Sequence, residues 1–441
     1  MNRLPVLLFC FVFSMGIGTI FAQKQNLNWA KIYADQLFHI TEVMVTDVAS
    51  PPVAARIYAY TNLAAYQTIL ESGGNFKQGE IPFILQVKRL EKSPSPTKLE
   101  SPEFTAIYAM LLVGEKVMPS GYLLKEKQKA WQDWGLKSRV VTKKNLETHL
   151  DFAKAVSIQV LELAKSDGYI QLTALNRYTP TEGEGFWYPT PPAYMAAVEP
   201  EWRTIRTFFL ENLEGFEPAP MAEFDLKMGS SFQKQVQEVY EVTQKLTEEQ
   251  KLIANFWDCN PFKVEFSGHM AIGVKKISPG GHWIGITGIS AAQKNLSFTE
   301  TAYIHTLVAM TLHDAFVSCW KTKYETNRFR PETVINEKLD SKWKPLLQTP
   351  PFPEYTSGHS VISTAAAEIL TSYFGDDFEF LDTSEVYFGL PERKFRSFHQ
   401  AAAEAAISRL YGGIHFRDAI ENGVIQGRNI GASIRKKIEK L

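Results

Sequence analysis

The sequence is poor in cysteine and carries no excess of basic charge, and each scarcity excludes a class of protein. Three of the 441 residues are cysteine, which is too few for a disulfide framework or a clustered zinc motif. Two of them, Cys259 and Cys319, lie far along the chain, where they either pair in an oxidising compartment or remain as buried free thiols. Lys and Arg number 47 against 48 Asp and Glu, and no stretch concentrates basic side chains. This balance excludes nucleic-acid binding through phosphate neutralisation.

Long apolar runs are absent except at the N-terminus. The first 22 residues, MNRLPVLLFCFVFSMGIGTIFA, combine a basic start, an apolar run and a small final residue before the polar QKQN. This pattern predicts a signal peptide over residues 1–22 with cleavage after Ala22, and a retained membrane anchor is the alternative. No later segment has the ~20 uninterrupted apolar residues of a membrane span. We therefore expect no membrane span after cleavage and a periplasmic or secreted location.

Helical periodicity dominates the rest of the chain, and the alternation typical of strands is scarce. With 45% hydrophobic and 12% aromatic residues, the chain can bury an enzyme-sized core. The pattern predicts an all-α protein of two packed helical bundles with long irregular loops: an N-terminal helical region over 23–228 and a C-terminal helical domain over 229–441. The expected helices cover residues 28–49, 53–70, 103–117, 144–165, 230–246, 297–327, 359–374, 397–411 and 416–440.

Two long segments rich in proline, glycine and aromatic residues interrupt these helices, residues 176–199 and 257–288. Loops of this length inside a compact domain are usually binding loops or lids. The alternative is a pair of surface loops that are packed by their own aromatic side chains.

The segment PPFPEYTSGHSVISTAAAEIL places Ser357, Gly358 and His359 in the first turn of an alanine-rich helix. One interpretation is structural, because Thr356 or Ser357 can cap the helix by accepting a hydrogen bond from a free amide. The other is functional, because a helix N-terminus that begins with glycine attracts anions and a histidine there can move a proton.

Upstream, the segment CWKTKYETNRFRPETV contains Lys323 and Arg330, seven residues apart. At this spacing both side chains would lie on one face of a helix, from which they could converge on a small anion. Pro331 disfavours a helical conformation at Arg330, so we expect the helix to end there. Lys321 and Arg328 are typical of a solvated basic face.

Downstream, the segment ISRLYGGIHFRDAIENG places Arg409 in the last turn of one helix and His415 at the start of the next. The intervening Gly412 and Gly413 are typical of a helix end. Because the positive end of the helix dipole disfavours an imidazolium, we expect His415 to be neutral, with one ring nitrogen free to attack or to coordinate. The three segments together supply a donor set for a tetrahedral oxyanion: one Lys, two Arg, a hydroxyl and a backbone amide.

The three segments together resemble the vanadium-dependent haloperoxidases and the type-2 phosphatidic acid phosphatases, which share one signature. Here that signature reads Lys323…Arg330-Pro331, Ser357-Gly358-His359 and Ser408-Arg409…His415. Four longer segments are similar to those of the exported bacterial haloperoxidases, including the iodide-specific peroxidases: SPPVAARIYAY, SPGGHW, CWKTKY and PPFPEYTSGH. On this likeness the resemblance covers nearly the whole mature chain and places the active site in the C-terminal bundle.

The resemblance implies a vanadate cofactor and a peroxidase that oxidises halide, iodide above all, with hydrogen peroxide to hypohalous acid. His415 would ligate vanadium and His359 would take or relay the proton of peroxide. Trp320 and Phe352 match aromatics of the halide pocket, and His282 and Trp283 would lie at its entrance. The vanadate oxygens would be held by Lys323, Arg330, Ser357, the Gly358 amide and Arg409.

The alternative is an exported acid phosphatase that binds phosphate in the same site. His415 would then attack phosphorus to form a phosphohistidine, and His359 would protonate the leaving alkoxide. A non-catalytic phosphate-binding protein would need the same donors but not both histidines. Two positions depart from the family pattern: Thr356 replaces a proline, and Asp418 follows His415 by three residues where the phosphatases have an acid after four. The second departure puts in doubt whether Asp418 orients His415. The sequence leaves the oligomeric state open.

Overall fold

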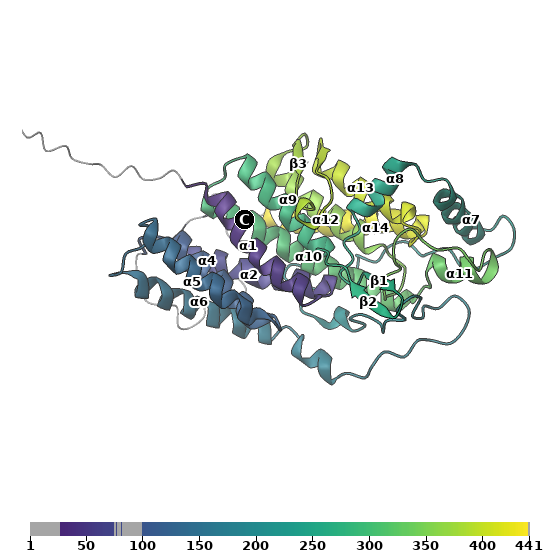
Figure 1. Ribbon diagram of the computed structural model, residues 1–441, viewed down its shortest axis with the longest axis horizontal. Helices are drawn as coiled ribbons and strands as arrows, with labels where there is room; N and C mark the ends of the chain where they lie inside the picture. The colour runs from purple at the N-terminus through teal and green to yellow at the C-terminus, as the bar shows by residue number, and fades with distance from the viewer. Residues whose placement is uncertain (1–26, 75, 77–80, 82–98, 440–441) are drawn as a thin grey trace, which may run out of the picture.

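The computed structural model describes residues 27–74, 76, 81 and 99–439, and the expected signal peptide lies outside the described residues. These residues fold into an elongated helical body (Figure 1). The elements of the first half are α1 (Trp29–Thr46), α2 (Pro51–Glu71), α4 (Pro102–Val117), η1 (Gly121–Leu123), α5 (Leu124–Lys137), α6 (Leu146–Lys165), η2 (Ile170–Ala174) and η3 (Trp202–Thr204).

The second half contains further helices and two short hairpins. Its helices are α7 (Ser231–Gln244), α8 (Glu248–Phe256), α9 (Pro279–Gln293), α10 (Phe298–Thr326), α11 (Pro331–Lys338), α12 (Gly358–Phe374), η4 (Val386–Phe388), α13 (Phe398–Tyr411) and α14 (Arg417–Ile438). Its strands are β1 (Val264–Ser267), β2 (Met270–Gly273), β3 (Phe380–Asp382) and β4 (Arg393–Phe395), which pair as two antiparallel hairpins.

Helix α10 joins the two halves of the molecule. It begins with a capping box, in which the Ser297 side chain accepts from the Glu300 amide and the Glu300 carboxylate accepts from the Ser297 amide. Most of its 29 residues are buried, including polar ones such as His313 and Asp314, so neighbouring elements surround it on most sides. One side packs against α2 and another against α12, and one continuous apolar core extends across both halves. The domain boundary near residue 228 stays a prediction.

The helices expected from periodicity all form, with ends that shift by a few residues. Among the described residues, four α-helices were not expected: α5, α8, α9 and α11. Helix α9 begins inside the segment 257–288 that was expected to be irregular, because Ser278 caps the helix and Pro279 starts it. That part of the prediction was wrong. The other segment, residues 176–199, contains no helix or ladder strand, as expected.

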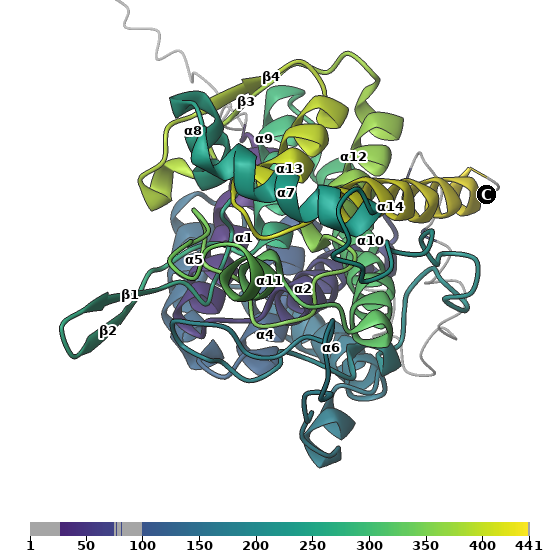
Figure 2. The same cartoon turned by 90° about the vertical axis from the view of Figure 1, so that its right-hand side faces the viewer.

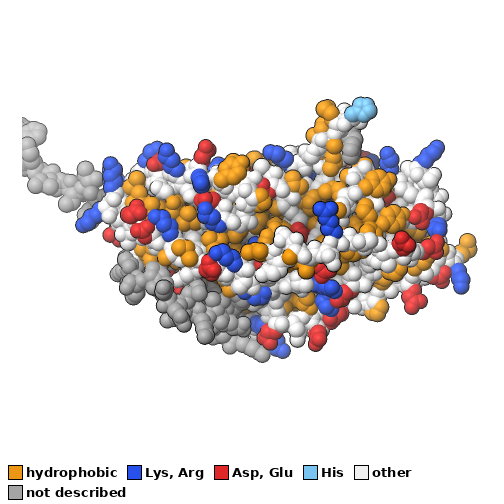
Figure 3. Space-filling view, turned by 90° about the horizontal axis from the view of Figure 1, so that it is seen from below, with side chains coloured by type: hydrophobic (Ala, Val, Ile, Leu, Met, Phe, Trp, Pro, Cys, Tyr) orange, Lys and Arg blue, Asp and Glu red, His pale blue; other side chains and the backbone are white. Residues whose placement is uncertain are grey.

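The protein surface mixes charges of both signs, and the face shown in Figure 3 has no dominant patch of either. The β1–β2 hairpin projects from the body (Figure 2), and its Met270 and Ile272 are exposed. Cys259 and Cys319 are both buried and free, so they do not form a disulfide. Among the described residues, no helix is both long and apolar enough to cross a membrane.

The pocket described below depends on the close contact of α12 with α14. Three glycines at four-residue spacing, Gly423, Gly427 and Gly431, place α14 directly on the α12 backbone. A Cβ atom at Gly427 would lie 2.2 Å from the carbonyl oxygen of Val361. Since neither backbone can yield locally, these positions require glycine.

We predict that Gly427→Ala lowers the free energy of unfolding by about 1–3 kcal/mol, the usual cost of overpacking. The gain in helix propensity of about 1 kcal/mol offsets this only in part. Urea denaturation measures the difference. The control is Gly273→Ala on the exposed hairpin, where a Cβ atom has no neighbour within 4 Å. Equal stability of the two variants would contradict the tight α12–α14 contact.

Candidate active site

The three sequence segments converge on one pocket between α10, α12, α13 and the loop after α8. The pocket encloses about 500 Å³ of empty space including its mouth. Lys323 and Arg330 are fully buried, and Arg409 is 2% exposed. Lys323, Arg330 and Ser357 do not border the pocket directly, and Arg330 reaches it through its hydrogen bond to His415. The expected residues that line the pocket are His359, Arg409, His415, Trp320, Phe352 and Gly358, together with Cys259, Asn260, Phe262 and Phe316.

His415 is held in one tautomer. Its Nδ1 lies 2.8 Å from Glu354 Oε1, and its Nε2 lies 3.1 Å from Arg330 Nη1. Because a guanidinium only donates, Nε2 accepts and the ring proton sits on Nδ1, where it bonds to the carboxylate. Burial, followed by the charges of Arg330 and Lys323, holds the pKa of His415 well below its usual value. The imidazole is therefore neutral, with the Nε2 lone pair directed toward the cationic side chains.

The neutrality of His415 was predicted correctly, but from a different cause. His415 lies two residues before the first residue of α14, Arg417. Desolvation, followed by the charges of the neighbouring cations, depresses its pKa.

Lys323 donates to three backbone carbonyls. Its Nζ lies 3.0 Å from the oxygens of Pro353 and Glu354 and also bonds to the Thr356 oxygen. Burial lowers the pKa of the ammonium group to about 7. The charge of Lys323 therefore depends on pH near neutrality and on any anion that binds next to it.

Arg330 and Arg409 are likewise held by carbonyl oxygens. Arg330 donates to the oxygens of Phe352 at 3.0 Å and Ile414 at 2.9 Å, and Arg409 donates to the oxygen of Trp257 at 2.7 Å. Burial lowers the pKa of both guanidinium groups to about 10, so both stay charged at neutral pH.

The expectation that Lys323 and Arg330 share one helix face was wrong. Helix α10 ends at Thr326, Asn327 adopts a left-handed conformation, and Arg330 is extended with φ −91° and ψ 157°. The two side chains converge because the chain turns between them, not because they follow one helix.

No carboxylate among the described residues lies within ion-pair distance of Lys323, Arg330 or Arg409. Three buried cations are thus neutralised only by carbonyl dipoles and by more distant acids. A buried charge without a counter-charge costs several kcal/mol. The pocket is therefore electrostatically suited to an anion.

Ser357, Gly358 and His359 lie at the N-terminus of α12. Ser357 is the cap and accepts from the Ser360 amide at 3.3 Å, so the structural interpretation is confirmed for this residue. A Cβ atom at Gly358 would lie 4.0 Å from the Lys323 side chain, which places this backbone beside the cations. His359 Nε2 is buried and has no partner among the described residues. Burial and then Arg409 hold the pKa of His359 well below its usual value.

Of the four aromatic or histidine residues expected around the halide, two line the pocket. The rings of Trp320 and Phe352 lie 4.9 Å apart and both border it. His282 and Trp283 do not border it, so their expected place at the entrance was wrong. Trp283 donates to Ser363 Oγ at 2.8 Å inside the core, and His282 is fully buried.

Two functional positions were missed from the sequence, Glu354 and Arg328. Besides His415, Glu354 Oε1 accepts from the Phe416 amide at 2.9 Å. Arg328 was expected on a solvated face, but it is 2% exposed and pairs with Glu354 at 3.4 Å and Asp418 at 2.7 Å. Asp418 therefore supports Arg328, and Glu354 orients His415. Lys321 pairs with Glu217 at the surface, as expected of a solvated residue.

Known proteins are similar to this chain in both sequence and structure. The family model "VCPO second helical-bundle domain" matches residues 303–441. The crystal structure of the first bacterial vanadium-dependent iodoperoxidase is 40% identical, covers 93% of this chain and 96% of its own, and superposes with a TM-score of 0.82. None of the curated proteins matches the chain.

Two further structures share the fold at lower identity. The holo form of a bacterial vanadium-dependent chloroperoxidase is 14% identical, covers 90% of this chain and 94% of its own, and has a TM-score of 0.63. The apo form of a bacterial vanadium-dependent chloroperoxidase is 17% identical, covers 88% of this chain and 93% of its own, and has a TM-score of 0.65.

The donor set fits vanadate. The negative charge of vanadate would compensate the three buried cations. The Nε2 lone pair of the neutral His415, which accepts from Arg330 in this structure, would then become the ligand. The carboxylate behind the imidazole is typical of ligating histidines, because it fixes the tautomer and raises ligand basicity.

We predict that Glu354→Gln weakens vanadate binding by about 10–100-fold, as loss of a partner behind a ligating histidine usually does. Asp418→Asn is the matched control, because Asp418 has no contact with His415 and should leave the dissociation constant near the wild-type value. Isothermal titration with orthovanadate measures both variants. A larger effect at Asp418 would contradict the assignment of Glu354.

We also predict that vanadate binding weakens as pH rises above about 7. The pKa of Lys323, lowered to about 7 by burial, leaves the ammonium charged below this pH and neutral above it. If the anion needs the charged form, its affinity falls by up to about tenfold per pH unit above 7. The thermal shift produced by orthovanadate between pH 6 and 9 measures this fall.

Lys323→Met is the control for that pH series, since it retains any titration of the ion itself. The wild-type protein should show a steeper fall than this variant. Parallel pH profiles would contradict the role of Lys323.

Proposed function

Since this chain belongs to the vanadium-dependent haloperoxidases, a family of oxidoreductases that use vanadate, we propose that it oxidises iodide with hydrogen peroxide to hypoiodous acid. The observation that carries the proposal is a group of three buried cations that act on His415 and have no carboxylate within ion-pair distance; one of them, Arg330, donates to His415 Nε2. The choice of iodide rests on the similar protein, which is an iodoperoxidase.

Vanadate, when bound, supplies a Lewis acid that activates peroxide, and this chemistry needs no haem or flavin. His415 would hold the metal through Nε2, while Lys323, Arg330 and Arg409 would neutralise the oxygens. Ser357 and the Gly358 amide complete the set of donors at the start of α12.

His359 acts on the proton of hydrogen peroxide. Its Nε2 faces no protein partner, and its lowered pKa keeps the ring neutral at ordinary pH. A neutral imidazole can accept a proton as peroxide enters and return it when the product forms. This role is separate from ligation, so loss of His359 reduces turnover more than it reduces vanadate binding.

Trp320 and Phe352 form the apolar side of the pocket. Lys323 Nζ lies 5.8 Å from the Trp320 ring centre and 5.2 Å from that of Phe352. The apolar surface of these rings and the nearby cation together suit a large, weakly hydrated anion. Iodide meets this description.

Phosphatase activity is the second candidate, supported by the Glu354–His415 pair. A carboxylate that fixes a neutral imidazole also makes Nε2 a nucleophile. In that case His415 would attack phosphorus and His359 would protonate the leaving alkoxide. The same cations would hold the phosphate oxygens.

We predict that the full chain loaded with orthovanadate oxidises iodide in the presence of peroxide. His415→Ala should abolish turnover and vanadate binding together, whereas His359→Ala should reduce kcat by about 10²–10⁴-fold, the usual contribution of a general base, and retain binding. Triiodide absorbance measures turnover, with bromide and p-nitrophenyl phosphate as parallel substrates.

His269→Ala, at an exposed histidine of the β1–β2 hairpin, is the control and should behave as wild type. Hydrolysis of the phosphoester that vanadate inhibits, with no halide oxidation, would contradict the peroxidase and support the phosphatase. Phosphate binding without either activity would indicate a binding protein.

Export to the periplasm or the medium is a further part of the proposal, supported by the sequence pattern of residues 1–22. N-terminal sequencing of the protein recovered outside the cytoplasm tests it. A mature N-terminus at Gln23 would support cleavage after Ala22.

A further inference from the structure

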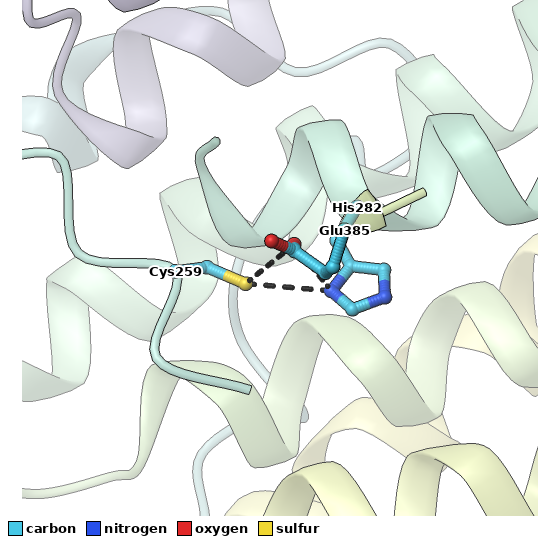
Figure 4. Close-up of side chains that lie close together, drawn as sticks. All are labelled: Cys259, His282 and Glu385. Carbon is cyan, nitrogen blue, oxygen red and sulfur yellow. Dashed lines mark hydrogen bonds and ion pairs between the residues drawn. The ribbon is translucent and has the colours of Figure 1, made fainter. Parts of the chain in front are cut away.

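A second cluster of ligand-type side chains lies behind the wall of the pocket. Cys259 follows α8, His282 lies in the first turn of α9, and Glu385 follows β3 (Figure 4). Their exposed fractions are 2%, 0% and 3%. Among the described residues, this is the only group of three such side chains whose ligand atoms lie within 4.8 Å of one another. The active-site chemistry described above uses none of them.

The distances within this cluster match the edges of a zinc tetrahedron. Cys259 Sγ lies 3.4 Å from His282 Nδ1 and 3.7 Å from Glu385 Oε1, and the nitrogen and oxygen are 3.2 Å apart. Zinc bonds of about 2.3 Å to sulfur and about 2.0–2.1 Å to nitrogen and oxygen give tetrahedral edges of about 3.6 Å for the sulfur pairs and about 3.3 Å for the third.

The histidine is prepared as a ligand by its other nitrogen. His282 Nε2 lies 2.7 Å from Asp382 Oδ2, so Nε2 donates to this carboxylate and Nδ1 faces Cys259 and Glu385. Asp382 is itself held through Oδ1 by the amide and hydroxyl of Ser384, at 3.0 and 2.7 Å. The Trp257 ring stacks on the imidazole at 4.4 Å. A carboxylate that fixes the tautomer is typical of zinc-bound histidines.

Nδ1 of His282 lies 3.2 Å from a carboxylate oxygen of Glu385, so a proton or a metal ion must lie between these two atoms. A proton on the imidazole or on the thiol can each bridge one pair of the three atoms, whereas one metal ion bridges all three pairs. Thiolate, imidazole and carboxylate together favour zinc over magnesium or calcium, which prefer oxygen ligands.

We propose that Cys259, His282 and Glu385 bind one zinc ion, with a water as the fourth ligand. The ion connects the loop after α8, helix α9 and the turn after β3. It thereby fixes the wall of the pocket, because Cys259 borders the pocket and the neighbouring Trp257 oxygen accepts from Arg409.

The test is the metal content of the full chain, purified without chelator or a histidine tag. Elemental analysis should give about one zinc per chain, the stoichiometry of a single closed site. Cys259→Ser and Glu385→Gln should lose this zinc. Cys319→Ser is the matched control, a second buried thiol with no histidine or carboxylate partner, and should retain it.

Cobalt gives an independent readout on the wild-type chain. Replacement of zinc by Co²⁺ should produce a sulfur-to-cobalt charge-transfer band, which Cys259→Ser removes and Cys319→Ser preserves. Asp382→Asn should keep the band and weaken metal affinity by about 10–100-fold.

Two results would overturn the proposal, and neither depends on a variant that fails to fold. The first is a zinc content of the wild-type protein far below one ion per chain. The second is the absence of the charge-transfer band after the folded protein is titrated with cobalt. The cluster would then be a protonated hydrogen-bonded group in which His282 is an imidazolium between Asp382 and Glu385. Vanadate binding and iodide oxidation are measured separately, so their failure leaves this test intact.

Discussion

The active site depends on three buried cations that have no carboxylate partners. Lys323, Arg330 and Arg409 are held in place by carbonyl oxygens, which orient a cationic group without neutralising it. The lowered pKa of Lys323 shows the cost of that arrangement. An anion that enters the pocket offsets the free-energy cost of burying these charges. The folded protein therefore favours oxyanion binding before any substrate is present.

One short segment, residues 352–357, organises most of this geometry. Its carbonyls receive the hydrogen bonds of Lys323 and Arg330, and Glu354 fixes the tautomer of His415. Its last residue, Ser357, caps α12. The segment lies between the long buried helix α10 and the α12–α14 pair, so the packing of three helices determines where the donors meet. The apolar core thereby controls the electrostatics of the site.

The sequence predicts the features that depend on local spacing. Helical periodicity gave the long helices, and the residue types around Lys323, His359 and His415 gave the oxyanion site. It did not predict Glu354, because an acid between proline and tyrosine is typical of a turn and its contact with His415 spans 61 residues. Arg328 was assigned to a solvated face, since the burial of one basic residue among several has no local signal.

The cluster around His282 shows the same limit. Cys259 and Glu385 lie 23 and 103 residues from the histidine, a spacing that no zinc motif has. Helix α9 was also hidden by its glycine-rich start, although Ser278 and Pro279 form a regular N-terminus. Contacts between distant segments arise from the tertiary fold, and a single sequence does not encode them in its local pattern.

The oxyanion site is tested most directly by an anomalous-difference map from crystals of the full chain soaked in orthovanadate and measured at the vanadium absorption edge. We expect one peak within bonding distance of His415 Nε2, near Lys323, Arg330 and Arg409. A peak elsewhere would contradict this site. The absence of any peak at an orthovanadate concentration that saturates the protein in solution would contradict it as well.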